Sequence, residues 1–278
     1  MARVGLPAGL NVHRLVAGAV IFNGIAISGI ATTVIATEVS AQPQEVDPGV
    51  YLRIGAGLQW PESDRWKDQD CASTQPPALF GCGSGENGRP LGATGSFQQN
   101  PVVDAALGYR WNSWLRTEAL LNWSPQLNWD GNSNFLGAGS RQPVGAAASA
   151  LAGFGVVVVD APPVLGLRPF IGAGLGLAGT RVGDVTYRFP AIGSDAVTVT
   201  RGGTTTSVAY LLTAGLAVPL SERIDLEMSY RWTDFGTVKT PSGSARVVRP
   251  QGSTTLRVGG TQVDLATQAV IASLRFRF

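Results

Sequence analysis

Histidine is almost missing from this sequence. The chain of 278 residues has one, His13, and it lies within the first forty residues. Once that leader is removed no imidazole remains, which excludes Ser-His-Asp hydrolysis, histidine general-base catalysis and histidine-ligated metal sites. We therefore expect a protein that is not an enzyme and that uses no cofactor and no metal.

Charge is scarce as well. Charged residues make up 14% of the chain, against about 25% in an ordinary soluble domain, and only two of them are lysines. Beyond the first forty residues no apolar run approaches the roughly 20 residues of a membrane-spanning helix. The net charge is +2 with the basic residues scattered singly, so nucleic acid is not expected as a partner. These features disfavour both a cytosolic enzyme and a helical membrane protein.

The first residues have the pattern of an export signal. Arg3 and Arg14 precede an apolar run over 15–36, and Val39-Ser40-Ala41 places small residues at the two positions that a signal peptidase inspects. We expect cleavage after Ala41, which makes 1–41 a signal peptide and 42–278 the mature domain. Because the run is longer than the usual signal core, a retained membrane anchor is the competing interpretation.

Cysteine is limited to Cys71 and Cys82. Two cysteines eleven positions apart in a Gly/Pro-rich stretch of an exported chain favour one local disulfide, which would order a loop that has little other reason to be ordered. The alternative is two free thiols. A metal site is disfavoured because two sulfurs without histidine leave the coordination shell half empty.

Alternation with a period of two residues recurs from residue 50 onward, in segments of about ten residues. In 224–232 the apolar residues occupy one face of an extended strand, and Asp225, Glu227, Ser229 and Arg231 occupy the other. Segments of this length suit strands that cross a membrane at a tilt. The sequence predicts eight strands, at 50–60, 99–111, 114–124, 149–160, 167–181, 205–219, 222–235 and 263–278.

The gaps between these strands alternate in length. Four are long, at 61–98, 125–148, 182–204 and 236–262, and three are short turns. This arrangement predicts an all-β, eight-stranded antiparallel transmembrane β-barrel with four long extracellular loops and short periplasmic turns. The loops are rich in Gly, Ser, Thr and Asn, which suits exposed segments that bind a partner, or segments that merely cover the barrel mouth.

Tryptophans occur at both ends of the predicted strands. Trp60, Trp123 and Trp232 lie at the long-loop ends, and Trp111 and Trp114 flank a short turn. This placement predicts two aromatic belts, one at each membrane interface. A soluble sandwich with aromatic residues in its core is the alternative, but it would seldom place charges so regularly opposite the apolar face.

The predicted inner face collects charges of both signs. An eight-stranded barrel is only just wide enough to be filled by its own side chains, so we favour a salt-bridged plug over an ion path. Asp225 and Glu227 are expected near Arg275 and Arg277, and Arg110 near Arg116 and Glu118; acid-base catalysis by the Asp225–Glu227 pair is disfavoured. The predicted interior charges are Asp104, Arg110, Arg116, Glu118, Asp225, Glu227, Arg231, Arg275 and Arg277.

The segments YLRIGAGL, DAALGYRW, PFIGAGLGLA and DLEMSYRWTDFG and the terminal LRFRF resemble the small outer-membrane barrel family. That family includes the transmembrane barrel of the major structural outer-membrane protein and the porin-family surface antigens of Gram-negative bacteria. The resemblance covers nearly all of 50–278. It implies that the last strand, with Phe276 and Phe278, is the assembly signal that the barrel-insertion machinery reads. No peptidoglycan-binding domain follows Phe278, so a role in tethering the cell wall is not expected.

Taken together, these patterns predict a monomer in the bacterial outer membrane, in contact with membrane lipid and lipopolysaccharide. The expected role is structural and in surface presentation, without catalysis. The alternative is a low-conductance, porin-like channel for ions or small solutes.

Overall fold

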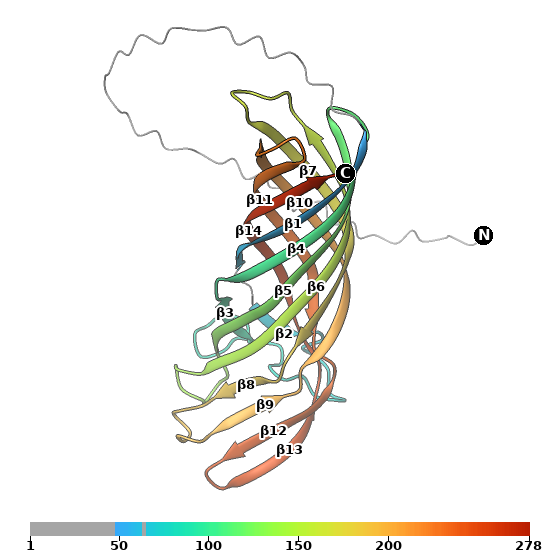
Figure 1. The fold of residues 1–278 in the computed structure, drawn as a ribbon. Coiled ribbons are helices and arrows are strands. Elements are labelled where there is room, and N and C mark those ends of the chain that lie inside the picture. Colours follow the sequence, from blue (N-terminus) through green and yellow to red (C-terminus); the bar gives the residue numbers. More distant parts are fainter. Residues whose placement is uncertain (1–47, 63–64) are drawn as a thin grey trace, which may run out of the picture. The chain divides into compact units, whose positions relative to one another are not determined.

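The computed structural model describes residues 48–62 and 65–278, so the predicted signal peptide lies outside the described residues. Eight antiparallel strands pair in a closed ring, because the first strand hydrogen-bonds to the last. The predicted eight-stranded antiparallel barrel is confirmed (Figure 1). Its strands are β1 (Gly49–Pro61), β4 (Asn100–Arg110), β5 (Leu115–Ser133), β6 (Pro143–Asp160), β7 (Arg168–Val182), β10 (Gly203–Pro219), β11 (Ile224–Lys239) and β14 (Thr261–Arg277).

The four long connections contain strands where the sequence analysis expected loops. Six further strands continue the sheet beyond one end of the ring, opposite the end that carries the short turns and the C-terminus (Figure 1). We call the four segments 61–98, 125–148, 182–204 and 236–262 together the distal layer. Its additional strands are β2 (Arg65–Asp68), β3 (Ala93–Phe97), β8 (Val185–Arg188), β9 (Val197–Thr200), β12 (Gly243–Arg249) and β13 (Gly252–Val258).

Two ring strands run further into the distal layer than expected because each passes through a β-bulge. In β5 the register shifts between Ser124 and Leu127, around Pro125, which has no N–H to donate to a ladder. In β11 the shift lies at Asp234–Thr237, where Gly236 adopts a φ of 75° and donates its N–H to the Asp234 carboxylate at 2.7 Å. A bulge absorbs one irregular residue, so pairing continues on the far side.

The barrel strands alternate between outward and inward side chains. Along β4, for example, exposed and buried residues alternate without a break from Asn100 to Arg110. Outward residues are large and apolar, including Ile54, Leu107 and Leu121, each more than half exposed. Such an apolar outer band is what a bilayer requires of a spanning barrel.

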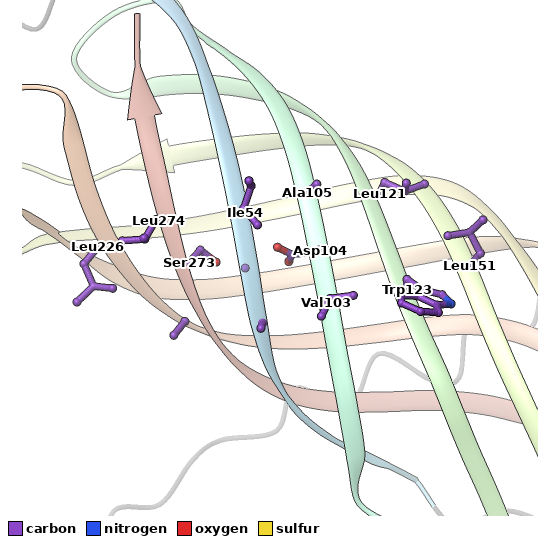
Figure 2. A pocket seen from close by; sticks show the side chains of 13 residues that line it. Ile54, Val103, Asp104, Ala105, Leu121, Trp123, Leu151, Leu226, Ser273 and Leu274 are labelled. Carbon is purple, nitrogen blue, oxygen red and sulfur yellow. The ribbon is translucent and has the colours of Figure 1, made fainter.

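A wide, open pocket of about 800 Å³ lies on this outer face (Figure 2). It forms where small residues such as Ala105 lie among the larger side chains of Ile54, Leu121, Leu226 and Leu274, and its lining comes from six neighbouring strands. Its rim is apolar and faces outward, so the pocket is part of the apolar outer face.

Candidate functional site: a charged barrel interior under an apolar layer

A single network of ion pairs fills the barrel interior near the short-turn end. Arg53 lies at its centre, with guanidinium nitrogens 2.9 Å from Glu118, 3.3 Å from Asp104 and 3.8 Å from Glu227. Arg116 joins Glu118, Glu227 and Asp160 at 3.5, 3.2 and 2.9 Å. Buried charges are tolerated only when they are paired. The fully buried members are five arginines and five carboxylates, namely Arg53, Arg110, Arg116, Arg231 and Arg275 with Asp104, Glu118, Asp160, Asp225 and Glu227.

The structure brings all nine sequence-predicted interior charges into this network. Arg275 binds Asp225 at 2.8 Å and Glu227 at 2.6 Å, as the pairing of β11 with β14 implies. Arg277 also reaches Asp225, at 3.2 Å, but its side chain is 26% exposed at the barrel mouth. Another of the nine, Arg231, binds Asp104 at 2.6 Å.

One expected pairing differs. Arg110 was placed near Glu118, but in the structure it binds Asp160, at 3.0 Å. Asp160 ends β6 and accepts from both Arg110 and Arg116, so it replaces Glu118 as the partner. Sequence reasoning missed Asp160, which ends a run of valines, and Arg53, which lies in a glycine-rich strand. The alternation of inward and outward side chains could have identified both residues, because each occupies an inward position of its strand.

Glycines on the inner face make space for the network. A Cβ at Gly55 would overlap the Asp104 carboxylate and the Ser273 hydroxyl, and one at Gly108 would overlap the ring of Tyr51. The Tyr51 hydroxyl donates to Glu118 at 2.9 Å, and its ring lies against the Arg116 guanidinium, 5.7 Å from the ring centroid. The small residues of these strands therefore determine how closely the charged side chains pack.

An apolar cluster closes the barrel above the charges. Trp66 and Trp129 are 2% and 1% exposed, and their rings meet edge to face at 6.5 Å. The cavity at this level is only about 10 Å³, room for about one water molecule, and Leu127 and Leu265 line it together with the two tryptophans. Part of the distal layer, around Trp66 and Trp129, is thus a hydrophobic core continuous with the barrel, whereas other parts such as β13 are exposed as the sequence analysis expected.

The remaining tryptophans face outward in two groups. Trp60 and Trp123 are 42% and 50% exposed toward the distal end of their strands, and Trp232, which is half-buried, donates its indole N–H to Glu62 at 3.2 Å. Trp111 and Trp114, at the short turn, are 54% and 53% exposed. The two groups therefore lie at opposite ends of the apolar outer face.

The terminal aromatic residues face away from the core. Phe278 is 83% exposed, and its N–H donates to the Val50 carbonyl at 3.2 Å. Phe276 is paired between Leu52 and Ile224 of the neighbouring strands. Phe278 therefore makes little contact with the folded barrel.

A disulfide joins Cys71 and Cys82, with their Cα atoms 4.9 Å apart. The loop between them is also held by Asp68, whose carboxylate accepts backbone N–H groups of Leu79, Phe80 and Gly81 at 2.8–3.3 Å. Burial raises the pKa of Asp68 above its ordinary value, and the three donors partly offset that rise. Two independent constraints thus order the same loop.

Replacing both cysteines by serine is expected to loosen this loop without unfolding the barrel. The bridge closes a short loop of the distal layer and joins no two ring strands, so its contribution of about 3 kcal/mol is local. Limited proteolysis with mapping of the cleavage sites should show faster cutting within 71–82, with an unchanged thermal unfolding midpoint. A lowered midpoint would show that the bridge supports the barrel itself.

Within the residues that the structure describes, no group of three or more Asp, Glu, His or Cys side chains is arranged to hold a metal ion. The Asp225–Glu227 pair shares Arg275, so both carboxylates are engaged in ion pairs. No helix among the described residues is long and apolar enough to cross a membrane.

Comparison with known proteins identifies the family. The family model of the outer membrane protein β-barrel domain matches residues 29–278, nearly the whole chain. This chain belongs to that family. As a member, it is a protein of the bacterial outer membrane.

Several solved structures of outer-membrane proteins are similar to this chain. Neisserial surface protein A is 18% identical, with 84% of this chain and 100% of that chain covered and a TM-score of 0.41. OprG of Pseudomonas aeruginosa is 15% identical, with 83% and 96% covered and a TM-score of 0.47. The protease OmpT of Escherichia coli is 8% identical, with 83% and 97% covered and a TM-score of 0.32. No curated protein sequence matches the chain.

Proposed function

We propose that this outer-membrane barrel is a non-enzymatic, non-conducting protein that presents its distal layer at the cell surface. The observation that carries this proposal is the filled interior. Five arginines and five carboxylates neutralise one another inside the ring, and an apolar cluster with a cavity of only about 10 Å³ lies above them. A filled lumen favours a role for the surface of the protein over transport through it.

The non-enzymatic part of the proposal rests on the state of the charged groups. Carboxylates that act as general acids or bases need access to a substrate, whereas Asp104, Glu118 and Glu227 are each at most 6% exposed and bound to arginine. The sequence after the predicted signal peptide also has no histidine.

The proposal includes an orientation and partners. The four long connections face the medium and the short turns face the periplasm, which is the usual arrangement of bacterial barrels. The barrel acts as a monomer among outer-membrane lipid and lipopolysaccharide, and its last strand, ending in Phe276 and Phe278, is read by the insertion machinery.

Epitope insertion tests this orientation. A short epitope placed at Pro250–Gln251, the tip of the β12–β13 hairpin, is expected to be labelled by antibody on intact cells. The matched control carries the same epitope at Leu165, which is 96% exposed in the short turn between β6 and β7, and it should be labelled only after the outer membrane is opened. Labelling of the Leu165 insertion on intact cells would overturn the proposed orientation.

A further inference from the structure

A second pocket, of about 410 Å³, lies within the distal layer. All four long connections contribute to its lining, which includes Leu79, Leu136, Ile192, Val247 and Leu256. Small-molecule sites are typically concave, mostly apolar and between about 300 and 1,000 Å³ in volume. The size and lining of this pocket therefore match those of a ligand site.

The floor of the pocket is held rigidly by aromatic packing. Phe135 stacks on Phe80 at 5.1 Å between ring centroids and meets Phe189 edge to face at 5.7 Å. The side-chain amide of Gln142 donates to the carbonyls of Phe135 and Gly139, at 2.8 and 2.7 Å, and accepts the Phe135 N–H at 2.8 Å. A site formed before binding spends little free energy on ordering its own residues.

Arg249 places a positive charge against this floor. Its guanidinium lies over the Phe189 ring, 4.9 Å from the centroid, and its Nη1 donates to the carbonyls of Val248 and Val197 at 2.8 and 3.2 Å. The other edge, formed by Nε and Nη2, donates only to the Thr198 hydroxyl, at 3.5 Å. Among the described residues Arg249 makes no ion pair, so this edge can receive the two oxygens of a carboxylate.

The charged residues of the lining favour an anion, and the nearest carboxylate, that of Glu86, accepts the N–H of the lining residue Gly137 at 2.7 Å. Arg249 and Arg257 are the charged residues of the lining, which contains no Asp or Glu. The connection 236–262 carries four basic residues and no acidic one. An apolar pocket with a fixed, unpaired guanidinium complements a molecule that has an apolar body and an anionic head.

We propose that this pocket binds a medium-chain carboxylate taken from the medium. The alkyl chain would occupy the space among Leu79, Leu136 and Ile192, and the carboxylate would accept from Nε and Nη2 of Arg249. The inference deepens the proposed function and rests on it, because a ligand from the medium must reach the distal layer from outside the cell.

Calorimetric titration tests the proposal with octanoate as the probe. The barrel is held in nanodiscs of zwitterionic lipid, the heat of empty nanodiscs is subtracted, and octanol and acetate are titrated in parallel. We expect saturable binding of one octanoate per barrel, with octanol and acetate each at least about tenfold weaker, because each lacks one half of the recognised chemistry. Absence of saturable binding, or octanol binding as tightly as octanoate, would overturn the proposal.

Three variants locate the site. Arg249→Gln should weaken octanoate about tenfold or more through loss of the charge-assisted pair. Leu136→Asn, at a side chain that is 66% exposed and so not needed for folding, should weaken it as well. Arg246→Gln is the matched control, because Arg246 lies on the same strand but is exposed and outside the lining, and it should leave the affinity within about twofold.

Equal weakening by Arg246→Gln and Arg249→Gln would overturn the proposal in favour of a general effect of surface charge. Binding that survives both Arg249→Gln and Leu136→Asn would also overturn it. Both faces of a nanodisc are open to solvent, so binding there does not depend on orientation. Failure of the binding site is therefore distinguishable from failure of the proposed surface location, which antibody labelling tests.

Discussion

Replacing Arg116 by methionine is expected to destabilise the barrel by about 3–5 kcal/mol. The Arg116 side chain is fully buried and lies within 3.5 Å of the carboxylates of Glu118, Asp160 and Glu227. Methionine fills part of the space but leaves an uncompensated negative charge in the interior. Urea unfolding of barrels folded in lipid vesicles, followed by tryptophan fluorescence, measures the loss.

Two further variants make this prediction specific. Arg223→Met, at an exposed arginine of the short turn between β10 and β11, should change the free energy of unfolding by less than about 0.5 kcal/mol. Adding Glu227→Gln to Arg116→Met should recover part of the loss, because it restores the balance of four buried arginines against four buried carboxylates. If Arg116→Met costs no more than Arg223→Met, the interior charges do not act as a closed, mutually dependent network.

The second large effect is expected on the outer face, where Ile54→Arg should cost about 2–4 kcal/mol. Ile54 is 53% exposed and lies on β1 between Val50 near the short-turn end and Trp60 of the distal aromatic group, so its side chain reaches the middle of the apolar band. The same vesicle unfolding measurement applies. Leu165→Arg, in a short turn outside the band, is the control and should be nearly neutral.

A small cost for both Ile54→Arg and Leu165→Arg would contradict the assignment of the outer face to lipid. A large cost for both would show instead that added positive charge impairs folding in general. The two variants therefore separate the cost of placing an arginine within the apolar band from the cost of adding a positive charge anywhere in the protein.

The sequence was sufficient to predict the ring strands, and the reason is visible in particular residues. In β11 the bilayer demands apolar residues outside, as at Met228 and Tyr230, and the narrow lumen demands polar ones inside, as at Glu227 and Arg231. Two opposed environments impose a strict period of two, which a sequence displays directly. Antiparallel neighbours then place Asp225 opposite Arg275, which is how that pair was anticipated.

The distal layer could not be predicted in the same way. Pro125 marks the expected end of its strand, but a bulge carries β5 past it to Ser133. Strands such as β2 and β8 have four residues each, too few for alternation to be distinguished from chance. The aromatic floor of the second pocket is assembled from residues far apart in sequence, including Phe80, Phe135 and Phe189, whose contacts depend on how the connections pack together.

The interior pairs were only partly predictable for a related reason. A strand pattern tells which side chains face inward, but not how far a long arginine reaches across the lumen. Arg53 contacts Glu227, although their strands, β1 and β11, are separated in the ring by β14. Arg110 likewise crosses over β5 to reach Asp160 on β6.

Conductance of the folded barrel in a planar lipid bilayer tests most directly whether the lumen is closed. We expect no discrete current steps from protein whose assembly has been verified, because paired charges fill the lumen and an apolar cluster with a small cavity lies above them. Reproducible steps whose size changes when Arg231 or Glu227 is replaced would contradict a closed interior and would favour a channel of low conductance.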